Sequence, residues 1–327
     1  MSGAGDFEVL RPATLFDAAT LLQRPDAMLV GGGTDLVPNL RRGLHAPRWL
    51  IDLSALGAAD GFDRIEVDAA GWHLGAGVRL ATLERHAALA AALPALVQAA
   101  HEVAGPGHRS AATLGGNLCQ DTRCIFYNQS AWWRAANDHC LKRDGDTCHV
   151  APQGRRCHAA YEGDLAPALL AHGAEVELVG LVTRRRRPLA ELWRDDGAAH
   201  LALAAGELVG AVHVPHPAPG SVSGYRKLRA RAAMDFPLAG VAIALRMDGG
   251  RLAGLRVGVT GTNSHPLLLA GTDDLLGRPA DEGTAQALAR LVRKQVAPMR
   301  STVTSSNHRR LVAAAAAARL LQELAGR

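Results

Sequence analysis

The sequence has no long hydrophobic run and no leader-like start. It contains no stretch of about 18 consecutive apolar residues, the length that a membrane-spanning helix needs. Its longest candidate, residues 312–321, is alanine-rich and flanked by arginines. Residues 1–10 carry little positive charge and no apolar centre, so we predict no signal peptide. These absences lead us to expect a soluble, cytoplasmic protein that does not associate with membranes.

Aromatic residues and excess charge are also scarce. Aromatics make up 4% of the 327 residues and the formal net charge is +5, whereas nucleic-acid binding usually combines a basic surface with exposed aromatic side chains. The one dense basic run, residues 184–187, precedes Pro188 and is interpreted as a solvated loop. We expect no nucleic-acid partner, although an acidic electron-transfer protein could dock on a basic face.

Cysteine is rare, yet four of the five cysteines lie close together. They are Cys124, Cys140, Cys148 and Cys157, in the spacing C-x15-C-x7-C-x8-C without any C-x-x-C pair. This spacing matches neither common zinc ribbons nor the usual ferredoxin run. Four nearby thiols are most simply explained by a metal ion or an iron–sulfur cluster. A disulfide pair or incidental cysteines remain as alternatives.

The segment around these cysteines is predicted to be an irregular loop, inserted at about residues 119–160. Turn signals recur in it, at residues 144–146 and 152–154, and long loops of this kind are usually functional or disordered. Its basic residues outnumber its acids and would offset the negative charge of a thiolate-ligated centre. They are Arg123, Arg134, Lys142, Arg143, Arg155 and Arg156.

The N-terminal region alternates as a small βαβ unit does. Apolar spacing predicts a helix at 14–23, a strand at 27–30, a helical turn at 34–42 and a strand at 49–53. The turn after the first strand reads Gly31-Gly32-Gly33-Thr34-Asp35, and such glycines let backbone amides converge on an anion. Taken alone, the same turn could simply form a corner of the chain.

A second glycine turn strengthens the first. Period-two alternation predicts a hairpin with strands at 65–67 and 72–74, followed by a helix at 81–103. Next comes Thr113-Leu114-Gly115-Gly116-Asn117, directly before the cysteine segment. Two such turns can hold one dinucleotide from both sides through backbone N–H donors, with side-chain bonds from Thr113 or Asn117.

The C-terminal third predicts a sheet covered by helices. We expect a strand at 209–214, a stiff linker at 215–220, paired strands at 241–247 and 252–258, and helices at 284–296 and 306–323. The 14 histidines are scattered, and no Ser, His and Asp arrangement of a hydrolase can be placed. The chain therefore offers binding sites rather than a nucleophilic active site.

In chain order, the two glycine turns, Gly163-Asp164-Leu165 with Pro167, and Tyr225-Arg226-Lys227 followed by Asp235 form a recognisable series. This series resembles the flavin-binding medium (β) subunit of the molybdenum hydroxylase, or xanthine dehydrogenase, family over essentially the whole chain. The resemblance implies an α+β architecture: a two-subdomain FAD-binding fold of the PCMH type and a C-terminal sheet-plus-helices domain. The implied domains are 1–55, 56–217 and 221–327. Ser110 and His308 depart from residues frequent in relatives.

For the flavin, the resemblance implies one set of FAD-binding residues. The two turns would wrap the pyrophosphate, Asp164 would bind the ribose or adenine side, Lys227 would lie near the polar groups of the flavin, and two valines would line the cofactor. The set is Leu29, Val30, Gly31, Gly32, Gly33, Thr34, Asp35, Leu36, Val103, Thr113, Leu114, Gly115, Gly116, Asn117, Asp164, Val209 and Lys227. Without the family, Asp164 could be a helix cap, Lys227 a solvated strand residue and the valines ordinary core.

The cysteine segment resembles an insertion in the β subunit of 4-hydroxybenzoyl-CoA reductases that holds an extra [4Fe–4S] cluster. Matching residue by residue makes Cys124, Cys140, Cys148 and Cys157 its ligands. Cys119 is left out and is expected to be a small buried residue.

The same resemblance implies an electron relay. Electrons would pass from a ferredoxin-like donor through the [4Fe–4S] cluster and FAD to a [2Fe–2S] small subunit and then to a molybdenum-cofactor large subunit. The implied assembly is a dimer of heterotrimers. The implied reaction is the reductive dehydroxylation of 4-hydroxybenzoyl-CoA to benzoyl-CoA. The alternatives are an oxidising molybdenum hydroxylase for another aromatic or heterocyclic substrate, a zinc-stiffened structural protein without flavin, and a free-standing flavin oxidase. The sequence alone leaves these open, together with the direction of electron flow.

Overall fold

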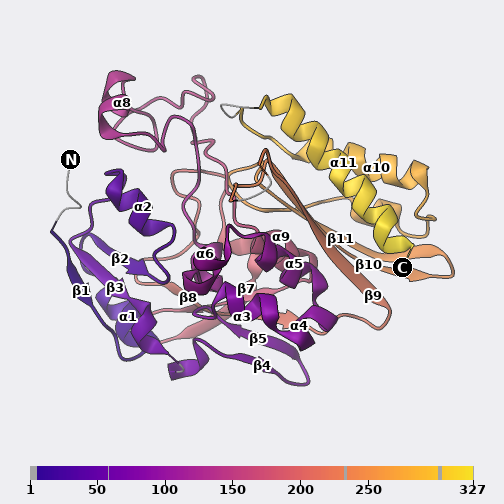
Figure 1. Cartoon of the computed structure of the whole chain (residues 1–327), viewed down its shortest axis with the longest axis horizontal. Helices are drawn as coiled ribbons and strands as arrows, with labels where there is room; N and C mark the ends of the chain where they lie inside the picture. Colours follow the sequence, from indigo (N-terminus) through magenta and orange to yellow (C-terminus); the bar gives the residue numbers. More distant parts are fainter. Residues whose placement is uncertain (1–5, 58, 232–233, 301–303, 327) are drawn as a thin grey trace.

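A computed structural model describes residues 6–57, 59–231, 234–300 and 304–326 of the chain. These residues form a three-stranded, a five-stranded and a four-stranded sheet. Figure 1 shows the first sheet on one side of the molecule, the second in the middle and the third, with its two long helices, on the other side. Within the described residues, no helix combines the length and the hydropathy needed to cross a membrane. The α+β class is the one expected.

The first sheet is entirely parallel, with the strand order β1-β3-β2. Parallel neighbours require crossover connections, which the two helices provide. Helix α1 begins with a reciprocal cap: Thr14 Oγ1 accepts from Asp17 N (3.1 Å) and the Asp17 carboxylate accepts from Thr14 N (3.0 Å). The predicted alternation of this region is confirmed by α1 (Leu15–Leu21), β2 (Ala27–Val30), α2 (Leu36–Arg41) and β3 (Trp49–Asp52). The strand β1 (Glu8–Leu10) was not predicted.

The second sheet is antiparallel, in the order β4-β5-β8-β6-β7. The predicted hairpin is confirmed, since Ile65 pairs with Leu74 and Val67 with Trp72. Helices lie over its strands, as Figure 1 shows. The strands are β4 (Ile65–Val67), β5 (Gly71–Gly75), β6 (Glu175–Val179), β7 (Arg184–Pro188) and β8 (Leu208–Pro215), and the helices that follow β5 are α3 (Leu80–Arg85), α4 (Ala87–Ala92), α5 (Pro94–Glu102), α6 (Pro106–Ala111), α7 (Leu114–Leu118), α8 (Ala131–Ala136) and α9 (Leu165–Ala171).

The single helix predicted at 81–103 is wrong, because the structure divides it into three. Pro94 opens α5, and a proline disfavours helical geometry in the residue before it. Leu93 accordingly has φ −129° and ψ 58°. His86 is extended, and its ring accepts a hydrogen bond from Leu89 N at 3.2 Å, which ends α3 and caps α4.

The basic run is a strand rather than the predicted loop. Residues 184–187 belong to β7 at one edge of the second sheet and pair with β6. Their charges have partners on neighbouring elements: Arg184 contacts Glu177 (3.1 Å) and Arg185 contacts Glu207 (2.8 Å). Cross-strand ion pairs of this kind make strand geometry acceptable for consecutive arginines.

The third sheet, in the order β12-β11-β10-β9, is packed on both faces. Helices α10 and α11 cover one face, while α5 and α9 contact the other. Along β10 the side chains alternate accordingly, with Val241 and Ile243 in the core under α10 and α11 and Ala242 in the core of the second sheet. The elements are β9 (Ser221–Leu228), β10 (Ala239–Asp248), β11 (Arg251–Thr260), β12 (Leu267–Leu268), α10 (Glu282–Gln295) and α11 (Ser306–Ala325).

Close packing fixes α9 against this third sheet. A Cβ atom on Gly258 of β11 would lie 2.1 Å from the carbonyl oxygen of Pro167 in α9, so the strand and the helix touch through their backbones. The segment that precedes α9 is thereby held beside β9. Short 3₁₀ helices complete the chain at Leu53–Leu56, Ala59–Gly61, Leu189–Leu192 and Thr272–Leu275.

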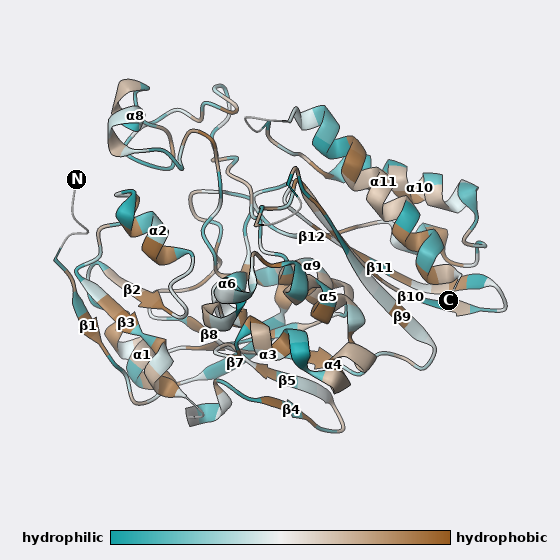
Figure 2. Ribbon diagram, in the orientation of Figure 1, coloured by the Kyte–Doolittle hydropathy of each residue, from teal (hydrophilic) through white to brown (hydrophobic). Residues whose placement is uncertain are grey.

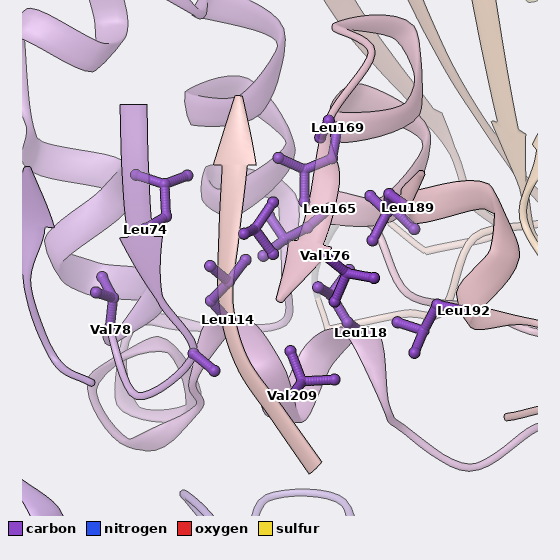
Figure 3. Packing of buried hydrophobic residues seen from close by; sticks show 14 of the residues in the cluster. Leu74, Val78, Leu114, Leu118, Leu165, Leu169, Val176, Leu189, Leu192 and Val209 are labelled. Carbon is purple, nitrogen blue, oxygen red and sulfur yellow. The ribbon is translucent and has the colours of Figure 1, made fainter. Parts of the chain in front are cut away.

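The largest hydrophobic core lies around the second sheet and reaches the first through α1 and β3. Figure 3 shows leucine and valine side chains from β5, α7, α9 and β8 meeting in it, among them Leu74, Leu114, Leu165 and Val209. In Figure 2 the strands β2 and β3 are coloured largely hydrophobic, in keeping with their burial in a parallel sheet. This core supports both glycine turns from below.

Candidate functional site

A cleft of about 600 Å³ opens between the first sheet, the helices of the second sheet and β9. This volume is in the usual range for small-molecule sites. Both glycine turns face the cleft, as do Asp164, Val209 and Lys227. The first turn lies at the carboxyl end of β2, where open parallel sheets commonly bind ligands.

The glycines of the first turn are required by close contact with the second. A Cβ atom on Gly32 would lie 1.9 Å from the Ala111 carbonyl oxygen, and one on Gly31 would lie 3.0 Å from Thr113 Oγ1. Gly33 has φ +70°, a left-handed conformation that glycine adopts at little cost. The two turns are therefore packed directly against each other at the base of the cleft.

The first turn also presents unused donors. Among the hydrogen bonds of the described residues, the backbone N–H groups of Gly32, Gly33, Thr34 and Asp35 have no acceptor. Unpaired backbone amides beside a cleft are unfavourable unless water or a ligand accepts from them. Successive free amides in such a turn form a site for an anionic group such as a phosphate.

The second turn is held by its own side chains. Thr113 Oγ1 accepts from Gly116 N at 3.1 Å, at the start of α7. Asn117 Oδ1 accepts from Leu165 N at 3.2 Å, so this side-chain oxygen orders the first turn of α9 instead of being available to a ligand. A Cβ atom on Gly115 would lie 2.8 Å from Ala76 Cβ, which fixes the turn on the chain segment after β5.

Asp164 and Lys227 form a buried ion pair beside the cleft. Lys227 Nζ lies 2.9 Å from Asp164 Oδ2, and the two side chains are 2% and 5% exposed respectively. Tyr225 donates to Asp164 Oδ1 at 2.6 Å, and Lys227 also donates to the Glu102 carbonyl at 3.0 Å. Burial raises the pKa of Asp164 against the opposing effect of Lys227 and Tyr225. Asp164 makes no capping bond to α9, so neither the cap nor the solvated-lysine interpretation holds.

A second polar network leads from the cleft toward the cysteines. Asp35 pairs with Arg123 and accepts from Asp121 N at 2.9 Å. Asp121 in turn binds Lys142 Nζ (2.6 Å) and the Tyr127 hydroxyl (2.9 Å). Burial opposes the charge on Asp121, but His45 and Lys142 hold the pKa of this carboxyl well below its usual range. Asp121 is therefore an anion held between Lys142 and His45.

All four clustered cysteines line one small cavity, together with Tyr127, Lys142 and His149. Cys140, Cys148 and Cys157 are buried and Cys124 is partly buried, and all four are free thiols. Burial raises the pKa of Cys124 to about 11 and that of Cys157 to about 12. These thiols therefore stay protonated at neutral pH unless a bound cation stabilises the thiolate. No three His, Cys, Asp or Glu side chains of the described chain are placed to hold a single metal ion.

The cysteine segment is mostly irregular, as predicted, but it contains one helix. Ser130 caps α8 by accepting from Trp133 N at 3.2 Å. Figure 1 shows α8 at the end of an extended excursion, above α2 and away from the sheets. The buried Arg134 ties this helix to the first subdomain by donating to the Gly43 carbonyl at 3.2 Å. The short alanine-containing helix was missed because turn signals surround it.

Of the 17 residues predicted to bind FAD, 16 line the cleft and Leu114 does not. Leu114 is fully buried in the core, as Figure 3 shows, because it occupies the inward position of the second turn. Several cleft residues were not predicted, since no local motif distinguishes them: Cys119, Asp121, Arg123, Glu162 and Phe236. Cys119, expected to be a small buried residue, is only partly buried; it packs against the core, and desolvation raises its pKa to about 12.

Two family models match successive parts of the chain. The model described as FAD binding domain in molybdopterin dehydrogenase matches residues 5–217, which contain the first two sheets up to β8. The model described as CO dehydrogenase flavoprotein C-terminal domain matches residues 223–324. Together they account for both the cleft and the third sheet.

Named relatives agree with these matches. The chain is 35% identical to the aldehyde oxidoreductase FAD-binding subunit PaoB of Escherichia coli K12, over 76% of this chain and 80% of that one. It is 29% identical to the carbon monoxide dehydrogenase medium chain of Afipia carboxidovorans, over 87% and 86% respectively. The fold is similar to a chain of the Cu,Mo-CO dehydrogenase crystal structure, with a TM-score of 0.81, 24% identity and 98% coverage of both chains.

The contact at Gly32 predicts a defined defect in cofactor content. Replacing Gly32 by Ala places a Cβ atom against the Ala111 carbonyl and separates the two turns. We expect the Gly32→Ala protein to retain less than about a tenth of the FAD of the wild type, a loss of over about 1.4 kcal/mol in binding. Absorbance of the purified chain measures it. Gly107→Ala is the matched control, because a Cβ there meets nothing within 4 Å; equal FAD in both variants would contradict the prediction.

The buried pair predicts a large effect on stability. Lys227→Met leaves the buried Asp164 carboxyl group without its cationic partner. Removing one member of a buried ion pair lowers the free energy of unfolding by about 3–5 kcal/mol. The double variant Asp164→Asn, Lys227→Met should regain much of this loss. Urea unfolding followed by circular dichroism measures the differences. The neighbouring Arg226→Met is the control, since the Arg226 and Glu323 side chains are 49% and 44% exposed and such pairs contribute about 0–1 kcal/mol.

Proposed function

Because the chain belongs to the family of FAD-binding subunits of molybdenum hydroxylases, we propose that it holds FAD in the cleft and serves as the electron-transfer subunit of a larger molybdenum enzyme. The observation that carries the proposal is the pairing of two glycine turns around one cleft, with four free backbone amides on the first. When bound there, FAD supplies chemistry that exchanges one or two electrons.

The residues of the cleft fit such an occupant. The free amides of residues 32–35 would bind the pyrophosphate, whose charge matches their dipoles. The glycines admit the cofactor close to the backbone, because any side chain would fill the space. Val103 and Val209 offer apolar walls, and Lys227 provides a fixed positive charge in the same cleft.

We further propose that Cys124, Cys140, Cys148 and Cys157 hold a [4Fe–4S] cluster. The support is that all four line one cavity although they come from distant positions in the segment. Four thiols in one cavity are the ligand set that a [4Fe–4S] cluster takes, and the segment resembles one that holds such a cluster. Lys142, only 5% exposed, lies at the same cavity and would compensate the charge of a thiolate-ligated cluster.

The Asp121 network would connect the two cofactor sites. Asp121 lines the FAD cleft, and the two groups that bind its carboxylate, Lys142 and Tyr127, line the cysteine cavity. One buried carboxylate thus contacts the walls of both sites. This proximity suits electron exchange within a single chain.

The proposed partners are a molybdenum-cofactor large subunit, a [2Fe–2S] small subunit and a ferredoxin-like protein, in a dimer of heterotrimers. Relatives are described as an FAD-binding subunit and as a medium chain, which supports a role inside a complex rather than as a free-standing oxidase. The reaction on the large subunit has two candidates. The cysteine segment supports reductive dehydroxylation of 4-hydroxybenzoyl-CoA, whereas the relatives named as an aldehyde oxidoreductase and a carbon monoxide dehydrogenase support substrate oxidation.

Cofactor analysis tests the two-site proposal. The chain purified without oxygen should contain about one FAD and about four irons with acid-labile sulfide, the content of a single [4Fe–4S] cluster. Cys148→Ser should lose most of the iron, whereas Cys119→Ala, outside the segment's four cysteines, should keep it. Zinc in place of iron, or FAD without iron, would remove the cluster from the proposal and leave a flavin subunit.

The direction of the reaction can be decided on the assembled complex. With a reduced low-potential donor and 4-hydroxybenzoyl-CoA, the reductive candidate predicts benzoyl-CoA, which mass spectrometry identifies. With an aldehyde and an artificial electron acceptor, the oxidising candidate predicts dye reduction. A complex that carries out only the second reaction would rule out the reductase assignment while leaving the FAD subunit role intact.

A further inference from the structure

Two carboxylates flank Gly163 at the cleft, and their surroundings differ. Asp164 has both a lysine and a tyrosine as hydrogen-bond partners. Glu162 is also buried, with a side chain 10% exposed, and it lines the same cleft. No described residue donates a hydrogen bond to its carboxyl group. A buried carboxyl without a donor is costly, and such a group in a binding cleft points to a ligand.

The nearest cation does not satisfy Glu162. Arg309 Nη2 lies 3.7 Å from Glu162 Oε1, too far for a hydrogen bond. The guanidinium of Arg309 is instead engaged by backbone carbonyls of the third domain, at Leu238 (3.0 Å), Met299 (3.1 Å), Pro237 (3.4 Å) and Gly261. Arg309 therefore forms an ion pair with Glu162 but donates no hydrogen bond to it within 3.5 Å.

The residues on either side of Glu162 fix its backbone beside the cleft. Tyr161 N donates to the Asn263 carbonyl at 2.9 Å, and a Cβ atom on Gly163 would lie 2.3 Å from the Tyr161 hydroxyl. The backbone on both sides of Glu162 is thus tightly packed. The backbone position from which the Glu162 side chain reaches the cleft is therefore fixed.

We propose that Glu162 contacts the bound FAD as a neutral carboxylic acid, so that FAD binding takes up a proton at this residue. The inference rests on the proposed function, because it requires FAD in the cleft. The pyrophosphate brings negative charge, and the cofactor displaces water from around Glu162; both effects disfavour a second anion there. Once protonated, the carboxyl group can donate to an acceptor oxygen or nitrogen of FAD, which an anion cannot do.

The charges around Glu162 are consistent with this protonation. Burial raises its pKa to about 7, against the opposing charges of Arg309 from α11, Arg123 from the cysteine segment and Lys227 from β9, while Asp164 raises it further. A proton is therefore accessible at neutral pH. If the complex with FAD holds this proton more tightly than the free chain does, the affinity for FAD falls as the pH rises above the pKa of Glu162 in the free chain.

The test compares FAD binding to the full chain freed of flavin. For the wild type, Kd should increase by up to about tenfold per pH unit above neutrality. Glu162→Gln, which is neutral at every pH and keeps a donor, should bind with a Kd constant within about twofold from about pH 6 to about pH 8.5. Glu175→Gln, at an exposed position on β6, should behave as the wild type. A wild-type Kd independent of pH would overturn the proposal.

Proton uptake can be counted without relying on a variant. Titration calorimetry of the wild type in two buffers with different ionisation enthalpies measures the protons bound with each FAD. We expect a large fraction of one proton near pH 8, and almost none for Glu162→Gln. Equal uptake by both proteins, or none by the wild type, overturns the role of Glu162 while leaving FAD binding intact. Absence of FAD binding by the wild type would instead overturn the proposed function and this inference with it.

Discussion

The buried pair of Asp164 and Lys227 is the interaction on which the site and the fold both depend. Asp164 begins α9 in the second subdomain, Lys227 belongs to the third sheet, and the lysine also donates to the end of α5. Three separately folded elements therefore meet at one charge pair. The pair replaces solvent between the domains and forms part of the cleft wall. One ion pair therefore contributes both to the wall of the cleft and to the contact between α9, α5 and β9.

Glycines at two places allow close backbone contacts, of which the one at Gly32 lies at the cleft and the one at Gly258 joins β11 to α9. Gly32 lies against Ala111 and Gly258 against Pro167, so backbone touches backbone at both places. Such contacts leave no room for alternative side-chain packing. The shape of the cleft is set by the absence of side chains at a few positions as much as by the side chains that line it.

The sequence predicted the parts of the structure that carry local signals. Alternation identified the β4–β5 hairpin, and two glycine turns, one after a predicted strand and one directly before the cysteine segment, identified two walls of the cleft. Long-range pairing was not predictable: the arginines of β7 read as a loop because their partners, Glu177 and Glu207, are distant in sequence or on another strand. Glu162 was missed because its proposed partner is the bound FAD, and no other described residue of the chain donates a hydrogen bond that would have pointed to it. Leu114 was wrongly predicted to line the cleft, because the motif predicts the turn but not which of its side chains points into the core.

The arginine-rich strand β7 has a consequence for assembly. An exposed edge strand offers unpaired amides and carbonyls to any other chain, and consecutive like charges oppose that addition. Arg184 and Arg185 pair with Glu177 and Glu207, whereas an incoming strand would have to approach the remaining positive charge of β7 without such partners. Continuous sheet formation between neighbouring molecules is thereby disfavoured along this side. The second sheet is therefore protected from extension at its β7 edge.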